Sequence, residues 1–164
     1  MAHPRLVLLA LAVVACSKSD TASTKASPVP AAQISAAEFK SLSWLEGKWR
    51  GIDENGRPFF EAYRRVDDST IHEGSFTDST FGRQKDSSTI NLRGGIVLDQ
   101  GTGKPWVATR IDSQSVEFTS KDSPTHHFRW TKQSADRWQA TLFSTDARGG
   151  LQQTILSMQR VKPQ

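Results

Sequence analysis

The spacing of hydrophobic residues changes once along the chain. Phe39 and Leu42 stand at helical spacing, and Ser35 and Glu38 before them form the three-residue spacing of a capping box. Gly47 supplies a stop signal for that helix. Beyond it, hydrophobic and polar residues alternate with a period of two, in runs rich in β-branched and aromatic side chains. The pattern predicts a short N-terminal helix followed by a long series of strands.

Nine segments have the pattern of strands, and turn signals rich in Gly, Asn, Asp and Pro separate them. The predicted strands are residues 48–53, 58–66, 70–78, 88–99, 104–111, 115–120, 125–131, 137–144 and 150–161. About eight to ten short strands joined by short turns predict an all-β, antiparallel, up-and-down meander. A sheet of that size normally closes into a barrel, which removes its exposed edges.

The alternation also predicts which side chains face the inside of the barrel. Hydrophobic residues that share one parity along their strands are Ile90, Leu92, Ile96, Leu98, Val116, Phe118, Phe128, Trp130, Trp138, Ala140 and Leu142, and His126 has the same parity. The strand at 104–111 is ambiguous, because Trp106 and Ala108 face one way while Val107 and Ile111 face the other.

The first fifteen residues form a segment of their own. Arg5 is followed by ten uninterrupted apolar residues, which as a helix span only ~15 Å, about half of a hydrocarbon core. Such a segment is typical of an export signal rather than of an anchor helix. We therefore expect residues 1–15 to be a signal peptide.

The residues that end this segment, Val13-Val14-Ala15-Cys16, resemble the lipobox of bacterial lipoproteins. The resemblance implies that the signal is cut before Cys16 and that this cysteine carries acyl chains, which makes it the lipid attachment site. The next residue is Ser17 and not Asp, and the sorting rule of enteric bacteria then implies the outer membrane. We expect a protein of the bacterial cell envelope that contacts the membrane through this N-terminal anchor.

Residues 16–33 are rich in Ser, Thr, Ala and Pro, with a single Val as the only sizeable apolar side chain after the cysteine. A segment of this composition cannot bury enough surface to offset its conformational entropy, so we expect a disordered tether. Residues 34–164 then form one barrel domain, for which the chain length is sufficient.

Charge and cysteine content exclude several functions. The 164 residues carry a formal net charge of +4, and no run of cations resembles a nucleic-acid patch. Cys16 is the only cysteine, and once lipidated it leaves no thiol for disulfides, metal binding or catalysis. We therefore expect no nucleic-acid partner.

The segment Leu45-Glu46-Gly47-Lys48-Trp49-Arg50-Gly51 is the strongest local motif. Its Gly-x-Trp entry into the first strand resembles the calycin-like barrels, which include lipocalins, fatty-acid-binding proteins and the nitrobindin group. The fuller motif looks most like an uncharacterised family of small bacterial barrels. The resemblance implies a calycin-like barrel in which Gly47 and Trp49 are structural, with Trp49 closing one end beneath the helix.

Candidate binding side chains follow from the parity of the strands. Glu61 and Tyr63 share one strand face and, inside a barrel, would present an acid and a phenol to a polar group. Trp106, His126 and Trp130 are further candidates for contact with a small ligand. The alternative for Glu61 and Tyr63 is a solvated ladder on the outer face.

Signatures of catalysis and of metal or cofactor binding are missing from the sequence. It contains no nucleophile elbow, phosphate loop, zincin helix or dinucleotide turn, and we expect no catalytic residues, no metal site and no cofactor. Haem is the most specific ligand that the resemblance to the nitrobindin group suggests. The last predicted strand lacks a histidine, so we expect no stable haem binding.

These observations favour a non-enzymatic, lipid-anchored barrel that binds a small apolar or amphipathic ligand. Two alternatives remain open: an isomerase or hydrolase on the same barrel with His126 or Glu61 as base, and an envelope interaction module with a fully packed barrel. A pocket of ~300 Å³ or more would favour binding.

Overall fold

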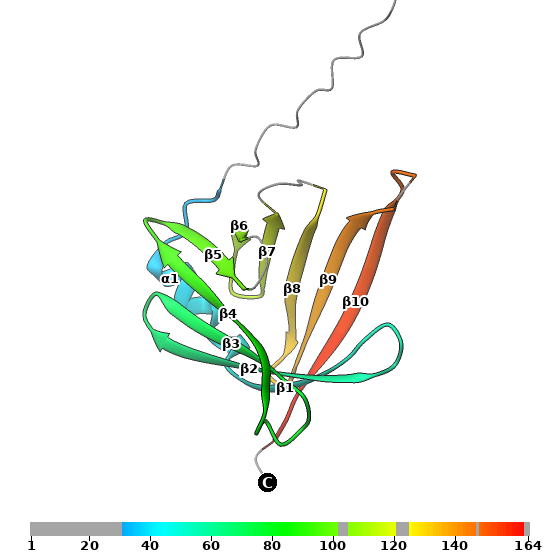
Figure 1. Cartoon of the computed structure of the whole chain (residues 1–164). Coiled ribbons are helices and arrows are strands. Elements are labelled where there is room, and N and C mark those ends of the chain that lie inside the picture. The colour runs from blue at the N-terminus through cyan, green and yellow to red at the C-terminus, as the bar shows by residue number, and fades with distance from the viewer. Residues whose placement is uncertain (1–30, 102–104, 121–124, 147, 163–164) are drawn as a thin grey trace, which may run out of the picture.

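The structure is a computed structural model that describes residues 31–101, 105–120, 125–146 and 148–162 (Figure 1). The expected signal peptide, Cys16 and most of the expected tether lie outside these residues. Two helical segments and ten strands are described: α1 (Ala36–Lys40), the 3-10 helix η1 (Ser41–Leu45), β1 (Gly47–Ile52), β2 (Pro58–Asp67), β3 (Thr70–Phe76), β4 (Gln84–Arg93), β5 (Ile96–Gln100), β6 (Trp106–Ile111), β7 (Ser115–Ser120), β8 (His127–Ser134), β9 (Arg137–Thr145) and β10 (Leu151–Arg160). Neither helical segment in the described ranges has the length and hydrophobicity needed to cross a membrane.

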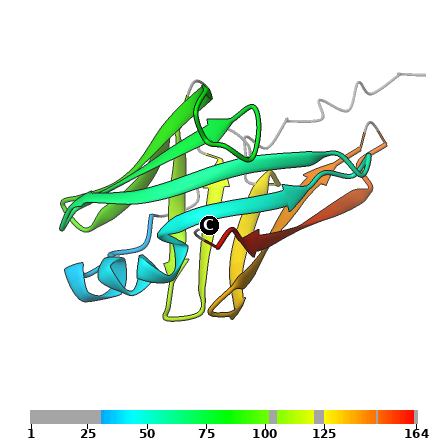
Figure 2. The same ribbon diagram turned by 90° about the horizontal axis from the view of Figure 1, so that it is seen from below.

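The ten strands form one closed antiparallel barrel. Each strand pairs with the next along the chain, and β1 pairs with β10, where Trp49 lies opposite Arg160, to close the ring (Figure 2). The predicted fold class, an all-β, antiparallel, up-and-down barrel with a short N-terminal helix, is confirmed.

The helical segment begins where the sequence predicts and closes one end of the barrel. Ser35 is the N-cap, and both bonds of the capping box with Glu38 are present. At the end of η1, the carbonyl of Leu45 accepts a hydrogen bond from Trp49 Nε1 at 2.6 Å. Arg160 of β10 lies over the Trp49 ring and donates to the carbonyls of Glu46 and Trp44. The last strand thus fastens the helical cap to the first strand.

The prediction of one strand over residues 88–99 is wrong. Gly94 and Gly95 both have positive φ, 58° and 79°, and they form the two-residue turn between β4 and β5. The turn pairs Leu92 with Val97, so Val97 and Asp99 face inward, whereas Ile96 and Leu98 do not. A two-glycine hairpin therefore reverses the parity that a continuous strand would carry.

The ambiguous strand at 104–111 is explained by a bulge. β6 pairs with β7 in one register up to Ala108 and in a shifted register from Arg110 onward. Trp106 and Ala108 therefore share the inner face with Ile111, although the sequence places Ile111 on the opposite parity. The extra residue of the bulge is what allows both parities to point inward.

Candidate functional site

The inside of the barrel contains a cavity of about 200 Å³ between β2 and the three strands β8, β9 and β10. Its lining consists of apolar and aromatic side chains with one acid and one phenol: Phe59, Glu61, Tyr63, Phe128, Trp130, Trp138, Ala140, Leu142, Leu156 and Met158. The volume is smaller than the ~300 Å³ that typical small-molecule sites exceed, so any occupant must be small.

The polar end of the cavity is a hydrogen-bonded pair on β2. The Tyr63 hydroxyl donates to Oε2 of Glu61 over 2.9 Å. Burial raises the pKa of Glu61 to about 7, with a further contribution from the charge of Glu73, while the Tyr63 bond acts in the opposite direction. Burial and the neighbouring Glu61 charge also raise the pKa of Tyr63 well above its usual value, so Tyr63 remains a neutral donor.

Aromatic rings surround this pair. The Tyr63 ring meets Trp130 and Trp138 edge to face, with centroid distances of 5.7 and 6.1 Å, and the two indoles are 5.5 Å apart. Phe128 extends the wall from Trp130 at 5.3 Å. The faces of aromatic rings carry negative potential, so a wall of rings beside an acidic side chain suits a positive charge better than a negative one.

Two more carboxyl groups lie on the inner face of the neighbouring strands. Glu73 on β3 is directly opposite Tyr63, and Asp99 on β5 is opposite Ile90 of β4. Both charges act on Glu61. Within the described ranges, none of these three carboxyl groups, which we name the acidic arc (Glu61, Glu73 and Asp99), forms an ion pair with a Lys or Arg side chain.

Serine hydroxyls interact with two members of the acidic arc, Glu73 and Asp99. Ser88 and Ser75 donate to the two oxygens of Glu73 at 2.8 and 3.1 Å, and Ser88 also hydrogen-bonds Asp99. Burial raises the pKa of Asp99 to about 6, and that of Glu73 is raised by the same cause. Oδ1 of Asp99 is buried without a hydrogen-bond partner among the described residues.

The structure brings three of the five candidate binding residues together. Glu61, Tyr63 and Trp130 all line the cavity. Trp106 faces inward but does not line the cavity. Its ring packs against Phe128, which does, with 5.0 Å between the ring centroids. His126 is exposed and precedes the first residue of β8, so its inward parity does not carry it into the barrel.

The two structural candidates lie at the closed end. Trp49 is 1% exposed and packs edge to face against Trp138, 6.0 Å away. Gly47 has a φ of 128°, in the region that favours glycine, and a Cβ there would overlap the Arg160 guanidinium.

Sequence reasoning did not place the acidic residues of β3 and β5 inside the barrel. Glu73 shares its parity with Ile71 and Ser75, but only the register with Tyr63 shows that this parity faces the cavity side. The inward position of Asp99 was not predicted because the Gly94-Gly95 turn was not recognised, and this turn decides which residues of β5 face inward. Recognising that pair as a hairpin signal would have placed Asp99 inside.

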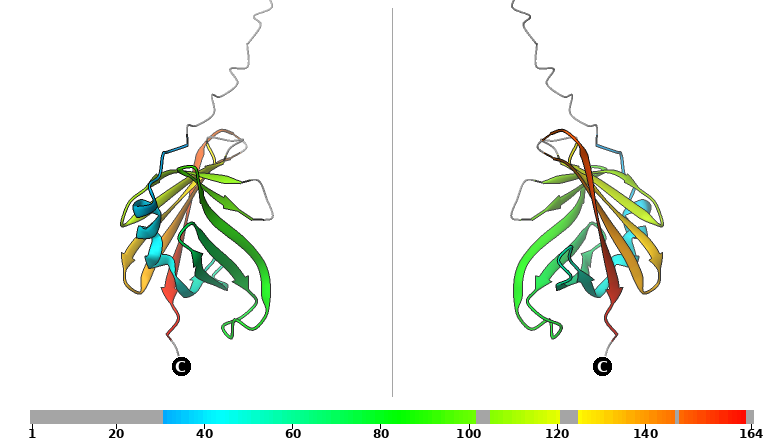
Figure 3. Two further views of the ribbon diagram at one scale, coloured as in Figure 1. Left: turned by 90° about the vertical axis from the view of Figure 1, so that its left-hand side faces the viewer. Right: turned by 90° about the vertical axis from the view of Figure 1, so that its right-hand side faces the viewer.

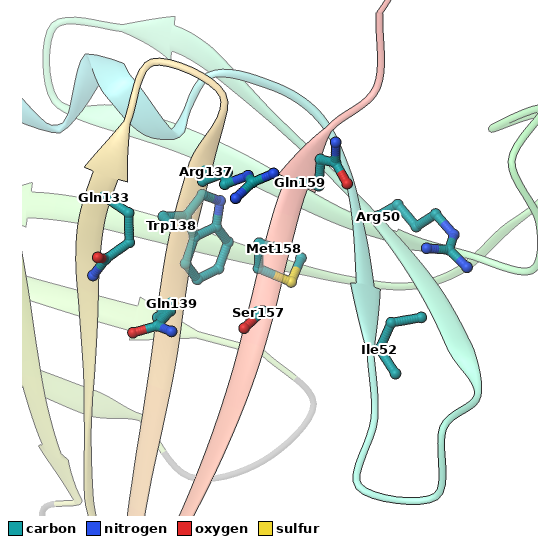
Figure 4. Close-up of a pocket in the computed structure, with 9 residues that line it drawn as sticks. All are labelled: Arg50, Ile52, Gln133, Arg137, Trp138, Gln139, Ser157, Met158 and Gln159. Carbon is teal, nitrogen blue, oxygen red and sulfur yellow. The ribbon is translucent and has the colours of Figure 1, made fainter.

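A second hollow lies on the outer face of the barrel, across β8, β9, β10 and β1 (Figure 4). It measures about 340 Å³, and its side chains are mainly long and polar, including Arg50, Arg137, Gln139 and Gln159. Arg50, Arg137 and Gln159 are exposed to solvent. Its lining contains no acidic side chain and no counterpart of the Glu61–Tyr63 pair of the inner cavity.

Metal binding finds no support in the side-chain geometry. Over the described ranges, no group of three or more His, Cys, Asp or Glu side chains is arranged to hold a metal ion. The carboxyl groups of the acidic arc interact through their charges and lie on three different strands. The site is therefore best described as an aromatic cavity with an acidic end.

No family profile and no curated protein match this chain. A DUF3598 family protein of unknown function from Nostoc punctiforme is similar in structure, with 16% identity and a TM-score of 0.49 over 79% of this chain and 50% of that one. This chain thus spans about half the length of that protein. Rv2717c from M. tuberculosis has 14% identity and a TM-score of 0.45, over 76% and 98% of the two chains. A redesigned β-barrel has 14% identity and a TM-score of 0.38, over 74% and 96%.

Proposed function

We propose that this protein is a lipid-anchored, calycin-like binding protein of the bacterial cell envelope, and that its barrel holds one small amphipathic molecule with a cationic end. The observation that carries the proposal is the inner cavity, in which an apolar and aromatic lining converges on the Glu61–Tyr63 pair. A cavity with few polar groups at one end orients an amphipathic ligand.

The size of the cavity limits the ligand. A volume of about 200 Å³ suits one aromatic ring or a short branched alkyl group with a single polar substituent. A long acyl chain would require more space than the lining leaves. The proposed ligand class is therefore a small aryl or alkyl amine, with its apolar part among the rings of Trp130 and Trp138.

The acidic side chains of the cavity decide whether the polar end of the ligand is positively or negatively charged. An ammonium group beside Glu61 gains both the carboxylate and the faces of the surrounding rings. A carboxylate ligand would bury a further negative charge beside the acidic arc, which has no Lys or Arg partner among the described residues. A cationic end is thus favoured over an anionic one.

The anchor rests on the sequence. The apolar run that ends at Cys16 supports lipid attachment there, and Ser17 supports sorting to the outer membrane. Two or more acyl chains at about 0.8 kcal/mol per buried methylene would make the attachment effectively permanent. The barrel would then act at a membrane surface.

A matched set of three probes tests the binding proposal: 2-phenylethylamine, 2-phenylethanol and 3-phenylpropanoate. We expect the amine to bind at least tenfold more tightly than the alcohol at pH 8, and the carboxylate to bind most weakly, as measured by calorimetry. Glu61→Gln should remove the preference for the amine while keeping alcohol binding, and Glu54→Gln, in an exposed turn, is the control. Equal affinity for amine and carboxylate, or no binding of any probe, would contradict the proposal.

An isomerase that uses Glu61 as a general base is the second candidate function. A pKa of about 7 is what a base needs at neutral pH, and Tyr63 offers a neutral donor beside it. Phenylacetone has one aromatic ring and one polar group, as the proposed ligand class requires, and it has exchangeable protons next to its carbonyl. Deuterium incorporation from D₂O that the wild type catalyses and Glu61→Gln does not would favour the enzyme.

A further inference from the structure

The groove on the outer face of the barrel carries a row of positive charge. The register places Arg50 of β1 opposite Gln159 of β10, and Gln159 opposite Arg137 of β9. Directly opposite residues of paired strands point to the same face of a sheet, so these three side chains form one row across the groove (Figure 4). Neighbouring strands are about 4.8 Å apart, which places the two arginine positions about 10 Å apart with one amide between them.

The positive charge of this row is not neutralised by neighbouring acids. Among the described residues, neither arginine of the row forms an ion pair, and no acidic side chain lines the groove. Asp53, the acid that follows β1, pairs with Arg57 at 2.9 Å. Asp136, the acid that precedes β9, has its Oδ1 3.6 Å from Nε of Arg160. Two like charges that face one groove raise the free energy of the folded state, and an anion bound between them offsets that cost.

A second row of side chains lies two residues further along the same strands. Ser157 of β10 is opposite Ile52 of β1 and opposite Gln139 of β9. Successive positions on one face of a strand are about 7 Å apart. The second row offers a hydroxyl and an amide, which both donate and accept hydrogen bonds, beside one apolar side chain. The groove of about 340 Å³ therefore has a cationic end and an uncharged, hydrogen-bonding end.

The groove is accessible from solvent. In the right-hand view of Figure 3, β9 and β10 cross the front of the barrel, and neither described helical segment covers them. The side chains of Arg50, Arg137, Ser157 and Gln159 are exposed. A ligand can thus reach both rows without entering the barrel, and the groove is a site separate from the inner cavity.

We propose that this outer groove binds a phosphorylated sugar, with the phosphate on Arg50 and Arg137 and the sugar hydroxyls on Ser157 and Gln139. A phosphate monoester carries about two negative charges at pH 7.5 and three terminal oxygens, so two guanidinium groups can bind it together. A carboxylate has one charge and two oxygens, which match a single arginine. The volume of the groove exceeds the ~300 Å³ at which small-molecule sites begin.

Four probes separate the contributions of phosphate, charge and sugar: glucose 6-phosphate, inorganic phosphate, gluconate and glucose. The full-length protein is titrated with each probe in excess by calorimetry at pH 7.5, at a physiological salt concentration that screens non-specific attraction. We expect glucose 6-phosphate to bind at least fivefold more tightly than inorganic phosphate and gluconate, and glucose to show no binding.

Variants locate the site. Arg50→Gln and Arg137→Gln should each weaken glucose 6-phosphate at least fivefold, and Gln139→Ala should weaken glucose 6-phosphate but not inorganic phosphate. Arg148→Gln removes the same charge from an exposed turn between β9 and β10 and is the matched control, with unchanged affinity. The melting temperature of Arg50→Gln and of Arg137→Gln without ligand should not fall, because each variant loses one of two like charges.

Unchanged affinity in Arg50→Gln and Arg137→Gln, or an equal loss in Arg148→Gln, would overturn the site. Equal affinity for glucose 6-phosphate and inorganic phosphate would overturn the sugar as its ligand. Binding of 2-phenylethylamine should be the same in all of these variants, since none of the exchanged side chains lines the inner cavity. Failure of the outer groove and failure of the inner cavity are therefore distinguishable.

Discussion

The Tyr63 hydroxyl and the Glu61 carboxylate, two residues apart on β2, form a 2.9 Å hydrogen bond inside the barrel. The two side chains share the inner face because a strand alternates with a period of two, and the rings of Trp130 and Trp138 shield them from water. This shielding raises the pKa of Glu61 to about 7. A carboxyl group with such a pKa changes its charge near neutral pH, and this property makes the site testable.

The first prediction concerns stability against pH. Folded Glu61 keeps its proton up to about pH 7, whereas in the unfolded chain it releases it near pH 4.5. The folded state therefore binds more protons between these values, and the free energy of unfolding should fall as the pH rises from 4.5 to 7, on the order of 2 kcal/mol. Asp99 acts with the same sign between pH 3.8 and about 6.

Urea unfolding of the wild type, Glu61→Gln and Glu54→Gln between pH 5 and pH 8 measures this slope. The wild type and Glu54→Gln should lose stability across the range, and Glu61→Gln should lose clearly less. Acids with lowered pKa values, such as Asp53 and Asp112, change stability only below this range. A slope that is the same in all three proteins would mean that Glu61 is not shielded from water.

The second prediction concerns the closed end of the barrel. Trp49 is buried, donates to the Leu45 carbonyl and packs against Trp138. Trp49→Ala should lower the free energy of unfolding by roughly 3–5 kcal/mol, a large part of the stability of a typical domain. Chemical denaturation followed by circular dichroism measures this loss, and a change below about 1 kcal/mol would argue against the closing role of Trp49.

The third prediction concerns Gly51, which faces the cavity side of β1. A Cβ at this position would overlap the Phe59 ring and come within 2.6 Å of Sδ of Met158, and both side chains line the cavity. Gly51→Ala should destabilise the barrel by about 1–3 kcal/mol and weaken the binding of 2-phenylethylamine, because these side chains must move. Gly101→Ala, where the nearest atom is 3.4 Å from the added Cβ, should change neither.

The fourth prediction concerns the anchor. Cys16→Ala should abolish the incorporation of labelled fatty acid and release the protein from membranes, since the thiol that we propose as the attachment site is gone. The barrel should keep its melting temperature, because its packed core begins at Ile34. Retention of the lipid label in the Cys16→Ala protein would show that the attachment site lies elsewhere.

The fifth prediction concerns haem. No histidine is among the residues that line the cavity, and His126 is exposed. Titration with haemin should therefore give no saturable shift of the Soret band, because haem needs an axial ligand in an apolar pocket. A sharp shift at one equivalent that His126→Ala removes would contradict this expectation.

Local patterns predicted the parts of the fold that depend on neighbouring residues. The capping box at Ser35 and the period of two along β2 and β8 were sufficient to place the helix and to bring Glu61, Tyr63 and Trp130 together. These signals act within a few residues, so one sequence contains them in full.

Features that depend on pairing between strands could not be predicted in this way. The bulge after Ala108 and the opposition of Glu73 to Tyr63 are properties of register, which turn geometry and the facing strand decide. His126 shows a second reason, since parity has meaning only within a strand and β8 begins one residue later. The inward position of Asp99 depends both on pairing between strands and on where β5 begins, because a two-glycine turn decides both.

Proton release on binding tests the central claim most directly. At pH 6, Glu61 is mostly protonated in the free protein, and an ammonium group beside it should convert it to the carboxylate. Calorimetry of 2-phenylethylamine binding in two buffers with different ionisation enthalpies should therefore show the release of close to one proton for each amine bound. The release should vanish in Glu61→Gln and fall toward zero at pH 9. Binding without proton release at pH 6, or the same release from Glu61→Gln, would contradict the account.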